Sequence, residues 1–284
     1  MSWSVIAVGT GSAFNTKDFQ TNFLLEAPSG KRLLVDLGTY GPIALERFGV
    51  HGGNVGQMID GVYVSHLHAD HIGGLEWLAF CTYFHPDKIK PKLYCVSGLM
   101  QQLWQKSLRG GLGSVQGKTN TLMDYFEGHP LKVNEVVYWE GLELQPVQTV
   151  HIMNGMEIVP SYGLLVREVN DRRHWPYDVF ITTDTQFCPK QIQDFYDMAG
   201  LILHDCETAP YFSGVHAHYD DLKTLPEKTR KKMLLCHYQP NPSQEPVPDG
   251  FRGFLKRGHR LTFEDAALKD LTEKDEKEFD DDDS

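Results

Sequence analysis

The sequence predicts an α/β (α+β) fold in which two β-sheets lie face to face between outer layers of helices. Strand-like segments come in hairpin groups, with helix-like segments at intervals between them, which favours such a layered arrangement. The chain has 284 residues, 41% of them hydrophobic, so it can bury a large core. No Pro-rich linker or internal repeat divides residues 1–262. We therefore expect these residues to form one domain.

The N-terminal third is expected to consist mostly of strands. Ser4–Val8 is the first, and Asn22–Glu26 and Arg32–Asp36 form a hairpin around Pro28-Ser29-Gly30, because such residues between two apolar runs favour a turn. A short helix is expected over Pro42–Phe48.

The rest of the chain continues with strands and helices. The expected strands are Gly61–Ser65, Lys92–Val96, Val133–Tyr138, Glu143–Val150, Gly163–Val169, Val179–Thr183, Leu201–His204 and Met233–Cys236. The expected helices are Ile72–Phe80, Leu99–Leu108, Pro189–Ala199 and Asp220–Lys232. Gly110–Pro130 is Gly-rich and polar without a clear period, which is typical of a lid or a subunit-contact loop.

Composition excludes several classes of protein. No run of about 18 apolar residues occurs, so no membrane-spanning helix is expected. The N-terminus lacks the basic and apolar regions of a signal peptide. The five cysteines are scattered and never in Cys-x-x-Cys spacing, which argues against a disulfide framework. A reducing cytoplasm is therefore the expected location.

The net charge of −11 is concentrated in the C-terminal tail. Residues 264–284 contain eleven Asp or Glu against three Lys, a net charge of −8, which leaves −3 for residues 1–263. We therefore expect residues 263–284 to form an acidic, disordered tail. A nearly neutral body gives no support for a stable nucleic-acid partner.

A histidine cluster follows the strand Gly61–Ser65. His66, His68, Asp70 and His71 place three imidazoles and one carboxylate within six residues. A turn there can aim His66 and His68 at one point, and Asp70 and His71 at a second point nearby. Imidazole and carboxylate ligands without thiolate suit Zn²⁺, with Mn²⁺ or Fe as alternatives.

Three later polar residues stand where apolar strands end, namely His151, Asp184 and His237. Asp184 follows an apolar run that would bury an unpaired carboxylate at high cost. Taken singly, each of the three fits a hydrogen-bonded buried polar group equally well. Taken with the cluster, they complete two metal spheres: His66, His68 and His151 in one, Asp70, His71 and His237 in the other, with Asp184 bridging the two.

These residues resemble the metallo-β-lactamase superfamily, whose motif is His-x-His-x-Asp-His. The segments Gly9–Ala13 and Leu34–Gly38 also match, so the resemblance covers nearly all of residues 1–240. It implies an αββα sandwich of two mixed sheets with the site at its rim. It also implies that Asp36 braces the metal-binding loops from behind the ligands.

Within the superfamily, the chain is most similar to the ribonuclease Z-like phosphodiesterase branch. Leu203–Thr208 resembles that branch's His-Glu-Ala-Thr motif, with Asp205 in place of Glu, and Ser213–Asp220 resembles its Gly-His-Ser-Thr segment. There a histidine protonates the departing 3′ oxygen. His216 and His218 compete for that role here. If Asp220 caps the following helix, His218 occupies the equivalent place, so we prefer it, with Asp205 holding its ring.

A closer resemblance is to the anti-Pycsar proteins of phages and their bacterial relatives, which degrade cyclic-nucleotide immune signals. It rests on HLHADHIGGLEWLAFCTYF, LWQKSLRGGL, VPSYG, TTDTQFCP, LHDCET and SGVHAHYDDL. The likeness implies a homodimer that hydrolyses 3′,5′-cyclic mononucleotides with two Zn²⁺ per chain, in the host cytoplasm if the chain is phage-encoded. Asp70 would both bind metal and orient the attacking water.

Two other functions remain open. A tRNA 3′-processing endonuclease carries a long tRNA-gripping arm between the counterparts of His151 and Asp184, but only 33 residues separate them here. A catalytically silent subunit would bind a nucleotide or a partner without reaction. The complete ligand set argues against that function.

Overall fold

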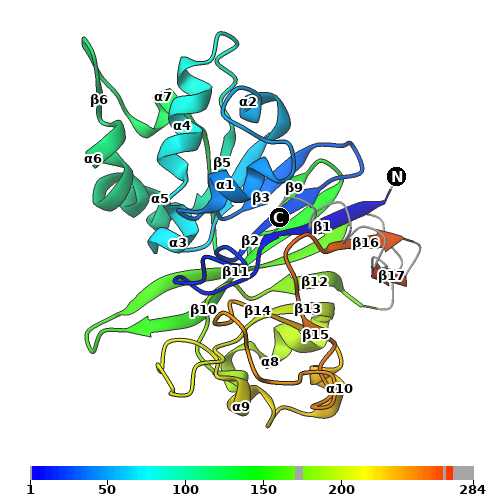
Figure 1. Ribbon diagram of the computed structural model, residues 1–284. Coiled ribbons are helices and arrows are strands. Elements are labelled where there is room, and N and C mark those ends of the chain that lie inside the picture. Colours follow the sequence, from blue (N-terminus) through cyan, green and yellow to red (C-terminus); the bar gives the residue numbers. More distant parts are fainter. Residues whose placement is uncertain (1, 170–174, 265–266, 271–284) are drawn as a thin grey trace.

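The computed structural model describes residues 2–169, 175–264 and 267–270. Two large mixed sheets face each other, with α1 to α7 above the first sheet and α8 to α10 below the second (Figure 1). The strand order is β17-β16-β1-β2-β3-β4-β5-β8 in the first sheet and β15-β14-β13-β12-β11-β10-β9 in the second. The predicted sandwich of two mixed sheets between helix layers is confirmed.

Each sheet combines an antiparallel and a parallel part, since β3, β4, β5 and β8 run parallel, as do β12 to β15. The first sheet contains β1 (Trp3–Gly9), β2 (Asn22–Glu26), β3 (Arg32–Val35), β4 (Gly61–Val64), β5 (Lys92–Val96), β8 (Glu127–Leu131), β16 (Arg260–Glu264) and β17 (Ala267–Asp270). The second contains β9 (Val137–Trp139), β10 (Leu142–Met153), β11 (Ile158–Glu168), β12 (Tyr177–Ile181), β13 (Ala199–Asp205), β14 (Met233–Cys236) and β15 (Gly253–Phe254).

The helices are short. They are α1 (Gly41–Glu46), α2 (Val55–Met58), α3 (Ala69–Ile72), α4 (Leu75–Phe84), α5 (Ser97–Leu103), the π-helix η1 (Trp104–Leu108), α6 (Arg109–Leu112), α7 (Leu122–Tyr125), α8 (Pro189–Met198), α9 (Tyr219–Leu222) and α10 (Glu227–Arg230). A small hairpin of β6 (Ser114–Val115) and β7 (Lys118–Thr119) follows α6.

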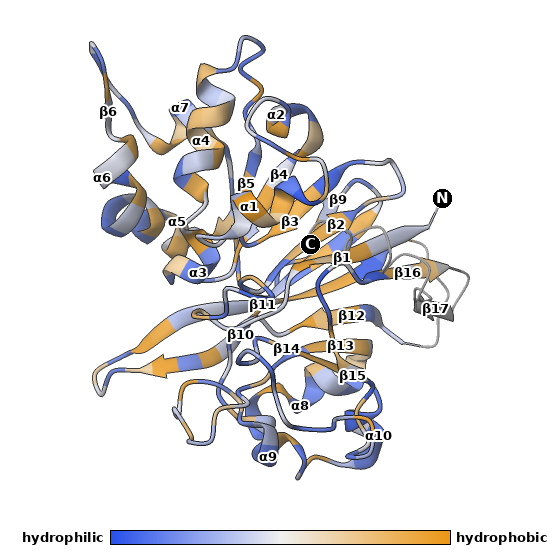
Figure 2. Cartoon of the chain, viewed as in Figure 1, coloured by the Kyte–Doolittle hydropathy of each residue, from blue (hydrophilic) through white to orange (hydrophobic). Residues whose placement is uncertain are grey.

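Three apolar layers hold the sandwich together, because successive strand residues point to opposite faces. In β3, Leu33 and Val35 pack between the two sheets, whereas Leu34 packs under the helices. In β11, Leu164 likewise faces the first sheet and Leu165 faces α8. Figure 2 shows the same pattern as apolar strands in the interior and hydrophilic loops outside.

The chain turns sharply where several strands end. Asp36 directly follows β3, His237 directly follows β14 and Thr183 lies two residues after β12, and all three have positive φ, at 63°, 64° and 51°. Non-glycine residues rarely adopt this conformation, and those that do cluster at functional sites. The three strands run in the parallel parts of their sheets, so their carboxyl ends can meet at one edge.

Several predicted elements differ from the structure. The helix expected over Asp220–Lys232 is wrong: Pro226 separates α9 from α10, because the residue before a proline disfavours the helical conformation. The irregular loop expected over Gly110–Pro130 contains α7 and most of β8. That strand was missed because its sequence, EGHPL, is polar and contains a proline; proline is tolerated there because β8 is an edge strand.

Two remaining expectations concern the chain's end and its surroundings. The predicted boundary between residues 262 and 263 falls within β16, and the tail residues 265–266 and 271–284 lie outside the described residues. Within the described part of the chain, no helix has the length and apolar character that crossing a membrane requires.

Candidate metal centre

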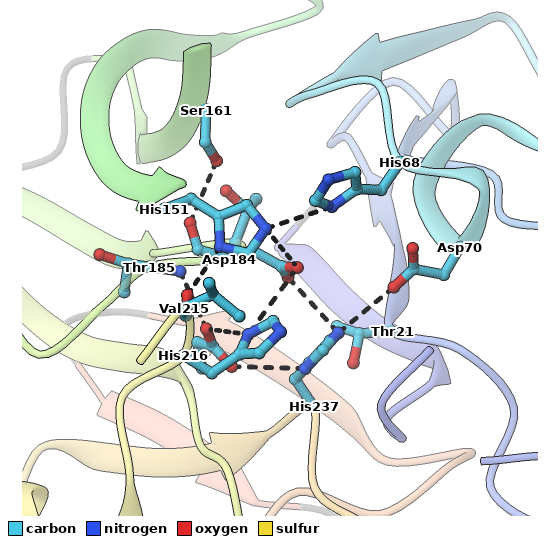
Figure 3. Close-up of polar contacts among 12 residues, drawn as sticks. Thr21, His68, Asp70, His151, Ser161, Asp184, Thr185, Val215, His216 and His237 are labelled. Carbon is cyan, nitrogen blue, oxygen red and sulfur yellow. Dashed lines mark hydrogen bonds and ion pairs between the residues drawn. The ribbon is translucent and has the colours of Figure 1, made fainter. Parts of the chain in front are cut away.

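The candidate site lies at the edge where the carboxyl ends of the parallel strands meet. The loop after β4 supplies His66 and His68, α3 supplies Asp70 and His71, and the turns after β12 and β14 supply Asp184 and His237. Figure 3 shows His68, Asp70, His151, Asp184 and His237 pointing toward one another.

His151 comes from inside a strand. We expected a strand to end there, but β10 continues to Met153 and its register with β11 shifts between Val150 and Ile152. This bulge leaves His151 without a partner across the ladder. Bulges re-aim a side chain, which accounts for an inward imidazole in the middle of a β-hairpin.

One group of donors consists of His66, His68, His151 and Asp184. The Nε2 atom of His66 lies 3.0 Å from Nδ1 of His68, which lies 3.2 Å from Nε2 of His151. Asp184 Oδ2 lies 3.6 Å from Nε2 of His66 and 3.5 Å from Nε2 of His151. Four donor atoms therefore converge on one point.

A second group consists of Asp70, His71, His237 and the same Asp184. Nε2 of His71 lies 3.3 Å from Asp70 Oδ2 and 3.2 Å from Asp184 Oδ1. Nε2 of His237 lies 3.4 Å from Asp70 Oδ2 and 3.6 Å from Asp184 Oδ1. Asp184 thus turns Oδ1 toward this group and Oδ2 toward the first.

The donor spacings fit metal ions. With metal–ligand distances of about 2.0–2.2 Å, two ligands on a tetrahedral ion lie about 3.4 Å apart, and the donor pairs above lie 3.0–3.6 Å apart. Nε2 of His71 is buried without a hydrogen-bond partner among the described residues. A buried nitrogen of this kind requires a partner, and a metal ion would supply it.

The outward nitrogens of the rings are held from behind. Asp36 accepts from Nδ1 of His71 at 2.7 Å and from the Ser65 hydroxyl at 2.6 Å, and that hydroxyl lies 3.0 Å from Nδ1 of His66. Nδ1 of His151 donates to the carbonyl of Val215 at 2.7 Å. Such contacts fix the ring orientation and leave the inward nitrogen for a metal. Asp36 therefore lies where the resemblance implies.

Burial and neighbouring charges shift the pKa values of most of the candidate ligands. Burial lowers the pKa of His66, His68 and His151, and a neutral imidazole is the form that binds metal. Burial alone would raise the pKa of Asp184 and Asp70, but neighbouring histidines hold both well below the usual range. Burial alone would lower the pKa of His71, but the carboxylates of Asp184, Asp70 and Asp36 raise it well above its usual value. The two ionised carboxylates thus lie among three rings with a lowered pKa and one, His71, with a raised pKa.

Asp205, at the end of β13, lies beside the donor groups and holds His216. Its Oδ2 is 2.8 Å from Nδ1 of His216 and accepts from the Thr185 amide at 2.9 Å, while its Oδ1 is 3.4 Å from Nδ1 of His237. The His216 ring stacks on that of His237, with centroids 4.5 Å apart. Burial lowers the pKa of His216, but the Asp205 carboxylate raises it to about 10.

His218 lies away from the donors, contrary to the role that we preferred for it. Its Nε2 donates to the Ala209 carbonyl at 2.9 Å and its Nδ1 accepts from the Asp220 amide at 3.2 Å. Neither nitrogen is therefore free to protonate a substrate. We expected Asp220 to cap the following helix, but the N-cap of α9 is His218, and Asp220 lies in the first turn. The capping contact withdraws the His218 ring from the site.

Two neighbouring polar residues, His204 and Glu207, form hydrogen bonds beside the donor groups. His204 is fully buried, with Nε2 2.6 Å from the Tyr196 hydroxyl and Nδ1 2.6 Å from the Asp205 carbonyl, so both of its ring nitrogens are engaged. Glu207 accepts a hydrogen bond from the Ser213 amide at 2.9 Å. Sequence reasoning missed the Val215 carbonyl, since a backbone acceptor leaves no signal in residue type.

The comparisons with known proteins agree with this geometry. The family model for the anti-Pycsar protein Apyc1 matches residues 3–261. An anti-Pycsar protein Apyc1 from Paenibacillus xerothermodurans is 33% identical over 94% of this chain and 100% of the relative. One from Paenibacillus harenae is 38% identical over 81% of this chain and 88% of the relative. One from Bacillus phage vB_BveM-Goe7 is 30% identical over 89% and 96%.

Solved structures support the fold. The metallo-beta-lactamase fold protein YhfI from Bacillus subtilis aligns with a TM-score of 0.67 at 18% identity, covering 92% of this chain and 99% of that one. A diphosphatase from the PhnP family gives 0.68 at 17%, over 93% and 98%. The short form of human tRNase Z gives 0.60 at 17%, over 91% and 98%.

Proposed function

Because this chain belongs to the family of the anti-Pycsar protein Apyc1, and is a metal-dependent hydrolase of the metallo-β-lactamase fold, we propose that it hydrolyses 3′,5′-cyclic mononucleotides to nucleoside 5′-monophosphates. It would thereby counter cyclic-nucleotide immune signalling. The substrate is a phosphodiester with one negative charge, so the site must accept an anion and protonate an alkoxide.

The observation that carries the proposal is that the two carboxylate oxygens of Asp184 face different donor groups. Its two oxygens face two separate donor groups 3.2–3.6 Å away, and the Asp205–His216 pair lies directly beside them. A site for two cations next to a histidine proton donor can supply what hydrolysis of a phosphodiester needs, an activated water and a proton for the leaving oxygen.

We assign the ligands as the sequence predicted them. His66, His68 and His151 would hold one ion, Asp70, His71 and His237 the other, and Asp184 both. Two Zn²⁺ suit this set, with Mn²⁺ or Fe as alternatives. When bound, two such ions lower the pKa of the attacking water and neutralise charge on the phosphoryl oxygens.

The chain's own residues then position and move protons. Asp70 would bind an ion through one oxygen and orient the attacking water through the other. Water attacks phosphorus as the bond to the ribose 3′ oxygen breaks, and that oxygen needs a proton. His216 takes this role in place of His218, because its ring lies 3.9 Å from Asp184 and is held by Asp205.

The two alternative functions receive less support. Between His151 and Asp184 the described residues are taken up by the end of β10, β11 and β12, so no long arm for gripping tRNA is present in that part of the structure. A silent scaffold would not need the complete and mutually braced donor set.

The proposal also covers the active domain, the location and the assembly of the protein. We place the activity in residues 1–262, without a role for residues 263–284, and the protein in the cytoplasm.

A homodimer would cover the tip of the β10–β11 hairpin, where Met153, Met156 and Ile158 are 61%, 94% and 43% exposed. Light scattering after size exclusion tests this assembly: a mass of one chain would contradict it.

An assay of purified protein by liquid chromatography tests the activity. It would use cCMP, cUMP, cAMP, cGMP and a pre-tRNA, with metal content measured on the same preparation. We expect 5′-monophosphates from cyclic nucleotides and intact pre-tRNA. A His66→Ala, His68→Ala double variant should lose the activity, and His129→Ala, on exposed β8, should keep it. Intact cyclic nucleotides at full metal occupancy would overturn the proposal.

A further inference from the structure

The segment of residues 209–217, here called the acid loop, connects the region after β13 to α9 and carries His216. Most of it faces solvent; Tyr211 and Phe212 are 67% and 60% exposed. His216 nevertheless needs a fixed position, because a proton donor acts only within hydrogen-bond reach of the leaving oxygen. Something must therefore hold this exposed loop in place.

His218 directly follows the acid loop, and its side chain contacts the first residue and the middle of the loop. Its Nε2 donates to the carbonyl of Ala209, the first residue of the loop, at 2.9 Å. Its Nδ1 accepts from the amide of Asp220 at 3.2 Å, just beyond the loop. Its ring stacks on Phe212, with centroids 3.8 Å apart and planes inclined by 27°. The side chain is 6% exposed, so these contacts are shielded from water.

These contacts define one form of the ring. A carbonyl can only accept, so Nε2 of His218 carries the proton, and the Asp220 amide can only donate, so Nδ1 is bare. The neutral ring thus links the first turn of α9 to the first residue of the loop. None of these contacts reaches a metal donor, and His218 lies outside every cluster of donor atoms found among the described residues.

The loop's other anchors come from the site itself. The Val215 carbonyl accepts from Nδ1 of His151, and the Ser213 amide donates to Glu207 at 2.9 Å. Backbone bonds pair the Glu207 amide with the Ala217 carbonyl, also at 2.9 Å. The Glu207–Ala217 bond already joins the chain on the two sides of the loop at its base. His218 adds a second closure through its side chain, which holds Ala209 and Phe212 against that base.

We propose that His218 is a positioning residue that closes the acid loop and thereby sets the place of His216 at the leaving oxygen. This role rests on the proposed function, in which His216 protonates the leaving oxygen. Without the closure the loop would keep its fold but lose its fixed path, and His216 would protonate the leaving group less often.

The dependence on leaving group tests this role. A cyclic nucleotide leaves as an alkoxide and needs the proton, whereas bis(p-nitrophenyl) phosphate releases p-nitrophenolate without one. We expect His218→Ala to lower kcat on the cyclic nucleotide about 10–100-fold, the effect of misplacing a group by about 1 Å. The rate on the aryl ester should change by less than about threefold, because acid catalysis contributes little there.

A double variant and a matched control sharpen the result. In a His216→Ala background, His218→Ala should add no further loss, since it acts through the missing ring. His51→Ala is the control, because His51 is exposed and its Nδ1 accepts the amide two residues on, as in His218. His218→Asn, which can still cap α9, should recover part of the rate. An equal loss on both substrates, or losses that multiply, would overturn the proposal.

Hydrogen exchange gives a readout that does not depend on the substrate. Amides of residues 209–217 in the metal-loaded protein should exchange faster in His218→Ala, and in His218→Asn if the first variant does not fold. Unchanged exchange would overturn the closure. If the wild-type protein cleaves the aryl ester but no cyclic nucleotide, the proposed function fails, and exchange alone then decides on His218.

Discussion

The two halves of the site are built in different ways. Residues 66–71 supply four donors from one short stretch of chain, the loop after β4 and the start of α3. The second half of the chain supplies three, from a bulge in β10 and from the turns after β12 and β14. In the first half, covalent connection keeps the donors close. In the second, only the register of the sheet does so.

This difference tells where the site is vulnerable. A compact loop fails when its bracing is removed, because the donors stay near one another but lose orientation. A set of scattered donors fails when one strand end moves. Within the second half, Asp184 matters most, because its carboxylate belongs to both donor groups and its loss would affect both. The following predictions test the two halves from the largest expected effect to the smallest.

Asp184→Asn should have the largest effect, because it removes the one charge shared by both donor groups without changing the size of the side chain. We expect activity to fall at least about 10⁴-fold, as for the loss of a central catalytic group, and metal content to fall with it. Elemental analysis and the cyclic-nucleotide assay check this. Full metal content with near-normal turnover would show that the two halves are not joined at Asp184.

His216→Ala should come next, and it separates proton transfer from metal binding in the scattered half. Metal content should stay constant while kcat on a cyclic nucleotide falls about 10²–10⁴-fold. Parallel elemental analysis and steady-state kinetics measure the two quantities. Loss of metal instead would identify His216 as a ligand.

Asp36→Asn tests the compact half. Asparagine tolerates the positive φ of this position, so the variant removes mainly the charge behind His71 and Ser65. Metal affinity should fall about 10–100-fold, as measured by competition with a chelating dye. An unchanged affinity would mean that the loop of residues 66–71 holds its shape without this brace.

Glu26→Gln lies outside both halves and should have the smallest effect. Glu26 pairs with Arg260 and Arg32 and ties β16 to β2. Burial raises its pKa, but the two arginines lower it below the ordinary 4.5. The ionised form therefore stabilises the fold above that pH, by no more than about 1 kcal/mol for a partly exposed pair, and this stabilisation is lost as the pH falls.

Thermal melting of Glu26→Gln beside the wild-type protein checks the sign. The difference in Tm should be largest at neutral pH and should shrink as the pH falls below 4.5. A difference that grows toward acid would mean that the carboxyl group acts in its protonated form.

The fold and the two donor groups could be anticipated from sequence because their signals are local. The buried strand β12 is followed closely by Asp184. A buried carboxylate at such a place either binds a metal ion or pairs with a charged or hydrogen-bonding group. The choice between His216 and His218 was different. His216 lies near the end of the acid loop and His218 is the N-cap of α9. The direction in which each side chain points depends on how the chain turns between them, and the pairing of Glu207 with Ala217 fixes that turn. No pattern of residue types reports it.

The distribution of the donors also has a consequence for how the protein is made. The chain emerges from the ribosome from its N-terminus, and domains fold as units. His66 and His68 are synthesised early, whereas His237 is synthesised after every other residue of the two donor groups. The first group is therefore present in the nascent chain once Asp184 has been added, and the second is complete only with His237. Under the proposed function, a product of translation interrupted before His237 would lack one ligand of the second group and would be inactive.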